Sequence, residues 1–96
     1  MEHEVKISEI QIIPVKPKDG LIGFASFVLD EKYYVGSVAI FTRLGKSGYR
    51  LVYPSKKLGD KNINLFHPIN PRAGEIIEEE VSKRIEQLMN SSYVNE

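Results

Sequence analysis

The chain has 96 residues, no cysteine, and 13 basic residues that balance 13 acidic ones. This length fits one domain, 1–96, and the lack of cysteine excludes disulfides, thiolate metal sites and cysteine nucleophiles. The sequence shows neither a signal peptide nor an apolar run of the roughly 20 residues that a membrane helix needs. We therefore expect a cytoplasmic protein with no membrane partner.

The first half of the chain has the pattern of a β-sheet. Residues 5–13 predict a strand with a bulge after Ile7, and residues 14–20, with two prolines and an Asp-Gly step, predict a loop. Residues 21–29 are apolar on both faces, which indicates a central strand covered on both sides. Residues 33–44 predict a third strand.

The second half predicts two shorter strands and one helix. Glycines at both ends of residues 45–48 indicate a hairpin turn into a fourth strand, 49–53, and residues 62–66 form a short fifth strand. Asn70 and Pro71 suit the N-cap and the first helical position. The helical spacing of the apolar residues Ile77, Val81, Ile85 and Leu88 predicts an amphipathic helix with a core-facing stripe.

These elements predict an α+β fold, in which an antiparallel sheet of about five strands is followed by one C-terminal amphipathic helix. Residues 91–96 are expected to be a frayed tail, so the ordered core spans about residues 4–90. One helix cannot cover both faces of such a sheet. This leaves strong sheet curvature or a homodimer as explanations for the two-sided second strand, and we favour the homodimer.

Charge is unevenly distributed along the chain. Residues 1–41 have four basic and six acidic residues, a net charge of −2, and residues 75–96 have two basic and six acidic, a net charge of −4. Residues 42–74 have seven basic residues and one acid, a net charge of +6. A basic surface attracts phosphates. The candidate nucleic-acid-binding residues are Arg43, Lys46, Arg50, Lys56, Lys57, Lys61 and Arg72.

The candidates fall into three groups along the sequence. The first three flank the 45–48 turn, the next three lie near the end of the fourth strand, and Arg72 lies in the first helical turn, where free N–H groups favour anions. Tyr49 and Tyr53 share a face of the predicted fourth strand and are candidates for stacking on unpaired bases. The alternative interpretation is a solvated surface whose lysines keep strand edges soluble.

Two short motifs are Pro-Ser-Lys-Lys at 54–57 and His-Pro-Ile-Asn at 67–70, the second just before the predicted helix. In combination they resemble the SpoVG family (stage V sporulation protein G, the septation regulator). Residues 29–30 and 34–38 also match, and the resemblance covers about residues 5–88. It implies a small, usually dimeric bacterial protein of the cytoplasm that binds DNA and RNA. It also implies regulatory effects on septation and sporulation, and no catalysis.

No constellation of residues predicts an enzyme. His67 has neither an acid nor a cysteine beside it, so we expect its ring to bond a backbone carbonyl and fix the turn. His3 is too distant in sequence to share a metal site with it. The acids Glu75, Glu78, Glu79 and Glu80 are interpreted as partners of the helix dipole on a solvated face rather than as cation ligands. Residues 45–48 lack the spacing of a phosphate-binding loop.

We therefore predict no catalytic residues, no metal, no cofactor and no small-molecule substrate. The expected function is that of a dimeric nucleic-acid-binding regulator. The alternative is a protein-interaction module of the cell-division machinery, in which the basic face meets an acidic partner protein and does not bind nucleic acid directly.

Overall fold

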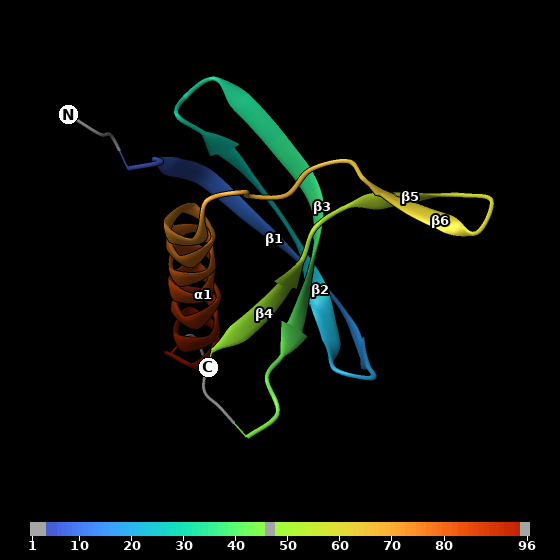
Figure 1. Ribbon diagram of the computed structural model, residues 1–96. Coiled ribbons are helices and arrows are strands. Elements are labelled where there is room, and N and C mark those ends of the chain that lie inside the picture. Colours follow the sequence, from blue (N-terminus) through green and yellow to red (C-terminus); the bar gives the residue numbers. More distant parts are fainter. Residues whose placement is uncertain (1–3, 46–47, 95–96) are drawn as a thin grey trace.

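The computed structural model describes residues 4–45 and 48–94 of the chain. The described residues form six strands and one helix, an α+β fold, as predicted (Figure 1). The elements are β1 (Ile7–Lys18), β2 (Leu21–Leu29), β3 (Tyr33–Thr42), β4 (Tyr49–Val52), β5 (Ser55–Leu58), β6 (Lys61–Asn64) and α1 (Pro71–Val94).

The strands form two antiparallel sheets instead of the single five-stranded sheet that the sequence predicted. The larger has the order β1-β2-β3-β4, and the smaller contains β5 and β6. Residues 55–58, which lie outside the predicted strands, form a strand because they pair with 61–64 across a turn at Gly59. Gly59 has φ +63°, a conformation that glycine adopts at little cost. The predicted fifth strand therefore pairs with this segment and not with the main sheet.

β1 is longer than predicted and includes residues 14–18, which the two prolines had indicated to be a loop. β1 is an edge strand, and proline is tolerated there because its missing N–H is not needed for pairing. The turn into β2 is reduced to Asp19 and Gly20, both with positive φ, as in a tight hairpin. The predicted bulge is confirmed by the register shift between Ser8 and Gln11.

α1 begins as predicted. The side-chain Oδ1 of Asn70 accepts hydrogen bonds from the backbone N–H groups of Arg72, at 2.8 Å, and Ala73, at 3.2 Å. These bonds satisfy two of the donors that a helix start leaves free. The helix extends to Val94, into the segment expected to be a frayed tail, and residues 95–96 lie outside the described part of the chain.

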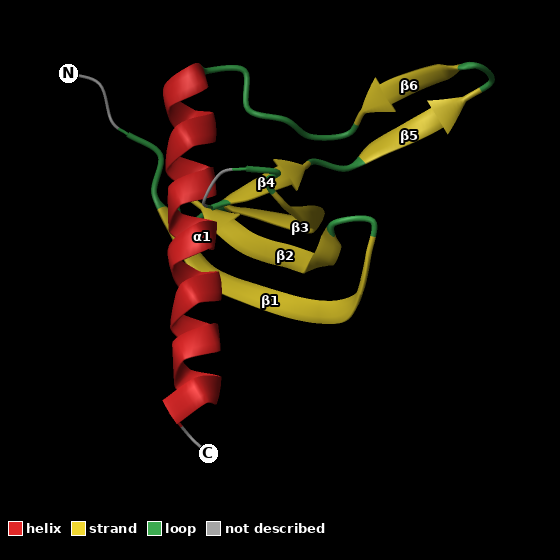
Figure 2. Ribbon diagram, turned by 90° about the horizontal axis from the view of Figure 1, so that it is seen from below, coloured by secondary structure: helices red, strands yellow, loops and turns green. Residues whose placement is uncertain are grey.

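α1 covers one face of the larger sheet (Figure 2). Ile77, Val81 and Ile85 are buried there against residues of β2, β3 and β4. The sheet side of this core contains Ala25, Phe27, Val35, Val38, Ile40 and Leu51. Leu88, predicted to continue the helical stripe, is 38% exposed. The last turns of α1 extend past the sheet (Figure 2).

The opposite face of the sheet, called the open face below, is also apolar. One row of paired residues crosses all four strands: Ile13, Phe24, Ala39 and Val52. Successive side chains of a strand alternate between faces, so these residues point away from α1. Ile13 is 62% exposed and Val52 is 40% exposed. The second strand is central, as predicted, but within the described chain α1 covers only one of its faces.

Candidate nucleic-acid interface

The hairpin of β5 and β6, residues 55–64, is called the arm below. It extends from the body on the side of the sheet opposite α1 (Figures 1 and 2). Its register pairs Lys56 with Ile63, Lys57 with Asn62, and Leu58 with Lys61. All of these side chains are exposed.

The register places the consecutive lysines on opposite faces of the arm. Neighbouring residues of a strand point to opposite sides, whereas paired residues point to the same side. Lys56 and Lys61 therefore share a face with Leu58 and Ile63. Lys57 lies on the other face, which is otherwise polar. The three arm lysines do not form one patch.

Of the three residues of the predicted cluster at the β3–β4 connection, Arg43 and Arg50 line one hollow. The guanidinium carbon of Arg50 lies 4.8 Å from the centroid of the Phe41 ring, a cation–π contact. Phe41 and Arg50 are directly paired, so both side chains are on the open face. Arg43 lines a hollow together with Phe41 and Arg50, and it also lines a groove between this connection and α1. Lys46 lies outside the described residues.

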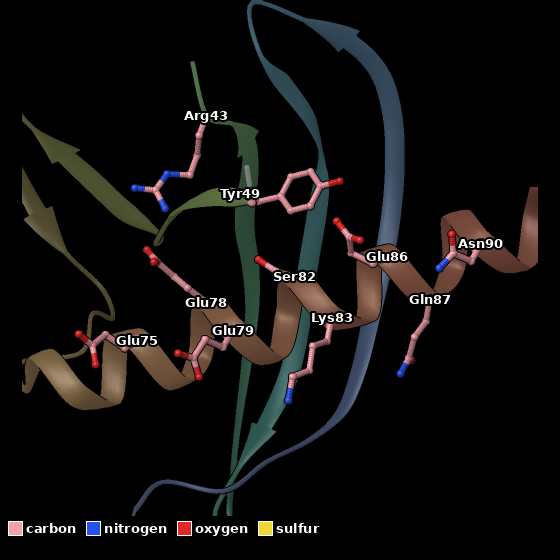
Figure 3. A pocket seen from close by; sticks show the side chains of 11 residues that line it. Arg43, Tyr49, Glu75, Glu78, Glu79, Ser82, Lys83, Glu86, Gln87 and Asn90 are labelled. Carbon is pink, nitrogen blue, oxygen red and sulfur yellow. The ribbon is translucent and has the colours of Figure 1, made fainter. Parts of the chain in front are cut away.

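The groove beside Arg43 is acidic. Its lining includes Glu75, Glu78, Glu79 and Glu86 of α1. Figure 3 shows Arg43 above the helix, with its guanidinium and the carboxylate of Glu78 directed into the same part of the groove. An acidic groove repels phosphate. Arg43 therefore lies at the margin of a surface that disfavours nucleic acid.

Arg72 is paired with two acids. Its Nε lies 2.9 Å from Oε2 of Glu4, and its Nη1 lies 3.3 Å from Oε1 of Glu75. The hydrogen bond that Arg72 donates to Glu4, followed by the one that it donates to Glu75, raises the pKa of Arg72 above its usual value. The positive charge at the helix start is thus largely balanced by its neighbours.

Tyr49 and Tyr53 are packed rather than free to stack on bases, so that prediction is wrong. They lie two residues before and two residues after Leu51, so their side chains are on the same face as that of Leu51. Both pack against the core on the α1 side. The Tyr49 hydroxyl donates to Sδ of Met89 at 3.5 Å. The centroids of the Tyr53 and Phe66 rings are 5.5 Å apart. Burial, with a smaller effect of Glu78, raises the pKa of Tyr53 to about 12.

Two exposed aromatic residues were missed by the sequence analysis. Tyr33 and Tyr34 begin β3, and both side chains are largely exposed. The available signal was their position directly after the tight turn at 30–32, where a strand begins at the edge of the fold.

His67 has the predicted structural role. Its Nδ1 lies 3.2 Å from the carbonyl oxygen of Pro68, to which it donates in the tautomer with a proton on that nitrogen. Across residues 4–45 and 48–94, no three histidine, aspartate or glutamate side chains gather as a metal site would require. No helix in the same part of the chain has both the length and the apolar character to cross a membrane.

The candidate basic residues therefore occupy separate places. The β3–β4 connection lies near the C-terminal end of α1, away from the start of the helix, and the arm projects to the other side of the sheet (Figure 1). Lys56 and Lys61 share one face of the arm, and Arg43 and Arg50 line one hollow. The +6 segment is continuous in sequence but not in space.

Comparison with known proteins decides the family. The family model SpoVG matches residues 5–87, from just before β1 into the second half of α1. The chain belongs to the SpoVG family. Two similar relatives are each named "Putative septation protein SpoVG", from Aster yellows witches'-broom phytoplasma (strain AYWB) and Onion yellows phytoplasma (strain OY-M). Each is 23% identical over 88 residues, covering 91% of this chain and 87% of the relative.

The two sequence motifs of the SpoVG resemblance have distinct structural places. Residues 54–57 lead into β5 and supply two of the arm lysines. Residues 67–70 form the turn that ends in the N-cap of α1. One motif therefore contributes charge to the arm, and the other positions the helix.

Proposed function

We propose that this SpoVG-family protein is a small cytoplasmic regulator that binds DNA, RNA or both, and that it acts as a homodimer. Its relatives carry the name of a septation protein, which supports a role in septation, and the family resemblance extends this role to sporulation. No catalytic step, cofactor, metal or small-molecule substrate is part of the proposal.

The observation that carries the proposal is the group of exposed basic side chains without an acidic partner. Within residues 4–45 and 48–94, the ion pairs involve Lys6, Arg72 and Lys83. The candidates Arg43, Arg50, Lys56, Lys57 and Lys61 make none. On the arm, three lysines accompany a single acid, Asp60. Phosphates of a nucleic acid are a natural counterpart for such charges.

The test is a salt titration of binding to labelled duplex DNA, single-stranded DNA and RNA, followed by fluorescence anisotropy. If the three arm lysines each contact a phosphate, the logarithm of duplex affinity should fall with a slope of about −2.7 against the logarithm of salt concentration. Replacing Lys56, Lys57 and Lys61 together by alanine should remove this slope and most of the binding.

The matched control replaces two exposed lysines outside the basic segment, Lys16 and Lys18 at the end of β1. We expect this variant to keep the slope of the unchanged chain. Absence of binding to all three nucleic acids at low salt would refute the proposal. So would equal losses in the arm variant and the control.

The second candidate function is a protein-interaction module of the cell-division machinery. It is favoured by the dispersal of the basic residues and by the acidic groove next to Arg43. Under this function, the pair Lys56→Glu and Lys57→Glu should abolish capture of an acidic division protein, while the unchanged chain shows no affinity for nucleic acid.

A further inference from the structure

A hollow lies at the end of the main sheet, beyond the row of residues that crosses its four strands. One wall is the β1–β2 turn, with Asp19 and Gly20, and the other is formed by the end of β3 and the start of β4. A hydrogen bond from the backbone N–H of Thr42 to the carbonyl of Gly20, at 3.0 Å, joins the two walls. Figure 1 shows the turn and the β3–β4 connection at the same end of the sheet. Two segments that are distant in sequence therefore build the hollow.

The hollow has the size and the lining of a small-molecule site. Its volume is about 670 Å³, and small-molecule sites usually have roughly 300–1,000 Å³. An apolar wall with a few charged or polar groups is also typical of such sites. Besides Gly20, the lining consists of Asp19, Phe41, Thr42, Arg43, Leu44 and Arg50.

Arg50 is held by the wall of the hollow. Its guanidinium carbon lies over the Phe41 ring, 4.8 Å from the centroid. The ring covers one side of the guanidinium, and the other side is open to solvent because Arg50 is exposed. Guanidinium planes stack on nucleobases as they do on aromatic side chains. The open side of Arg50 is therefore a platform for a base.

Leu44 supplies an apolar surface to the same hollow. Its side chain is 96% exposed, although it lines the hollow together with Arg50. Contact with the sugar or the base of a ligand would remove this apolar surface from water, which is favourable. Leu44 thus favours an organic ligand over a bare inorganic anion.

Charge divides the hollow into two parts. Arg43 and Arg50 supply two positive charges and Asp19 one negative charge, so the hollow is net basic. Figure 3 shows the Arg43 guanidinium facing Glu78 across the neighbouring groove, but Arg43 makes no ion pair in the part of the chain that the structure describes. As an exposed side chain it changes rotamer rapidly and reaches either side. The arginines attract a phosphate, whereas Asp19 repels it and accepts hydrogen bonds from N–H groups.

We propose that the hollow binds one nucleoside phosphate. The arginines hold its phosphate, its base stacks on the open side of Arg50, and an amino group of the base donates to Asp19. A base inside a duplex does not fit, because both of its faces are stacked and its amino group is paired.

Two sources share this chemistry, a free nucleotide and an unpaired nucleotide of a single strand. For the strand, the inference rests on the proposed function and gives it a preference for unpaired nucleotides. For a free nucleotide, the inference is independent of nucleic-acid binding.

The first experiment follows the amide NMR spectrum of the isotope-labelled chain during titration with guanosine monophosphate, uridine monophosphate or pyrophosphate. Guanosine monophosphate should shift the signals of Gly20, Thr42 and Arg50. Uridine monophosphate should bind more weakly because its base has no amino group, and pyrophosphate should bind most weakly because it has no base.

Two substitutions at Arg50 separate stacking from charge. Arg50→Ala should lower the affinity for guanosine monophosphate about tenfold, or ~1.4 kcal/mol, since it removes both the platform and a charge. Arg50→Lys keeps the charge without the planar guanidinium. This variant should keep the affinity for pyrophosphate and lose the preference for the nucleotide.

Asp19→Asn tests the orientation of the ligand. Asp19 has φ +54°, a conformation that asparagine also tolerates, so the turn should be kept. Loss of the negative charge should raise the affinity for pyrophosphate and reduce the preference for guanosine over uridine monophosphate. A rise for both nucleotides with an unchanged preference would contradict the contact between Asp19 and the base.

The matched control is Arg84→Ala, which removes the same charge from α1, where Nη1 of Arg84 lies 3.2 Å from Oε1 of Gln87. It should change neither affinity. Thermal unfolding by circular dichroism should show that the control and the three hollow variants are folded.

The second experiment measures fluorescence anisotropy of a labelled single strand rich in guanine and of a blunt duplex. Arg50→Ala should weaken binding of the single strand more than binding of the duplex, and Arg84→Ala should not. This result without shifts by the free nucleotide assigns the hollow to a strand. Shifts by the free nucleotide in a chain that binds no strand support the hollow while the proposed function fails. Strand binding that is equal in Arg50→Ala and Arg84→Ala, with no shifts by guanosine monophosphate, overturns the hollow while the proposed function survives.

Discussion

The two faces of the main sheet are built from the same strands and are similarly apolar, yet one is buried and the other exposed. Phe27 of β2, on the α1 side, has no exposed surface. Phe24, three residues earlier, points to the open face and is only half-buried. Strand periodicity assigns residues to faces, but it does not determine what covers each face. For one face the cover is α1, and for the other we propose a second copy.

The largest expected effect comes from exchanging a phenylalanine on each face for alanine. Phe27→Ala should lower the free energy of unfolding by about 3–5 kcal/mol, because it removes a fully buried ring and leaves a cavity. Phe24→Ala should cost less in the monomer, and its cost should increase with protein concentration as the dimer forms.

Urea unfolding at two protein concentrations measures both effects. The proposed difference between the two faces is contradicted if Phe24→Ala lowers the free energy of unfolding as much as Phe27→Ala does in dilute protein. It is also contradicted if the loss of free energy of unfolding in Phe24→Ala is independent of protein concentration, because the open face would then have no partner.

A second, smaller effect concerns two glycines of the sheet. A Cβ at Gly23 would lie 2.7 Å from the backbone carbonyl oxygen of Ile13, on the neighbouring strand β1. A Cβ at Gly36 would meet only the exposed ring of Tyr34, at 3.0 Å. Gly23→Ala should therefore destabilise the chain by about 1–3 kcal/mol, the usual cost of overpacking.

Gly36→Ala is the control, because the side chain of Tyr34 can rotate away whereas the backbone of β1 cannot. Thermal unfolding of both variants gives the comparison. Equal melting temperatures would show that the backbone of β1 shifts to accommodate the new methyl group. β1 would then not be a rigid edge of the sheet.

Much of the main body could be predicted from the sequence, because its signals are local. The Asn70 cap, the apolar stripe of α1 and the phase change after Ile7 each depend on residues within one element. The wrong predictions concern segments whose conformation depends on the strand that they pair with. Residues 14–18 became a strand at an edge that tolerates proline, and residues 55–58 became a strand through their partner across the Gly59 turn.

The candidate site was less predictable than the fold. Sequence charge identified the basic segment, but the register separates Lys56 from Lys57, and Glu4, distant in sequence, balances Arg72. The packing of Tyr49 and Tyr53 depends on which face of the sheet α1 covers. The alternation of side chains along a strand shows that the two residues share a face, but it does not show which face is covered.

The smallest effect concerns Tyr53, at the margin of the helix-covered face. Its hydroxyl is buried and has no hydrogen-bond partner among the described residues. Tyr53→Phe should therefore keep or slightly raise stability at neutral pH, since a buried hydroxyl without a partner has a desolvation cost that the phenyl ring avoids. The difference between the two proteins should appear in alkali.

In the unfolded chain a tyrosine loses its proton near pH 10, whereas burial raises the pKa of Tyr53 to about 12 in the fold. The unfolded state thus binds fewer protons between these values, and stability falls as the pH rises from about 10 to about 12. Urea unfolding at several alkaline pH values should show a smaller loss for Tyr53→Phe than for the unchanged chain. Tyr33→Phe, at an exposed position, should follow the unchanged chain. Identical alkaline losses in all three proteins would mean that Tyr53 ionises without disturbing the fold, and that this margin of the covered face is as open to solvent as the face opposite.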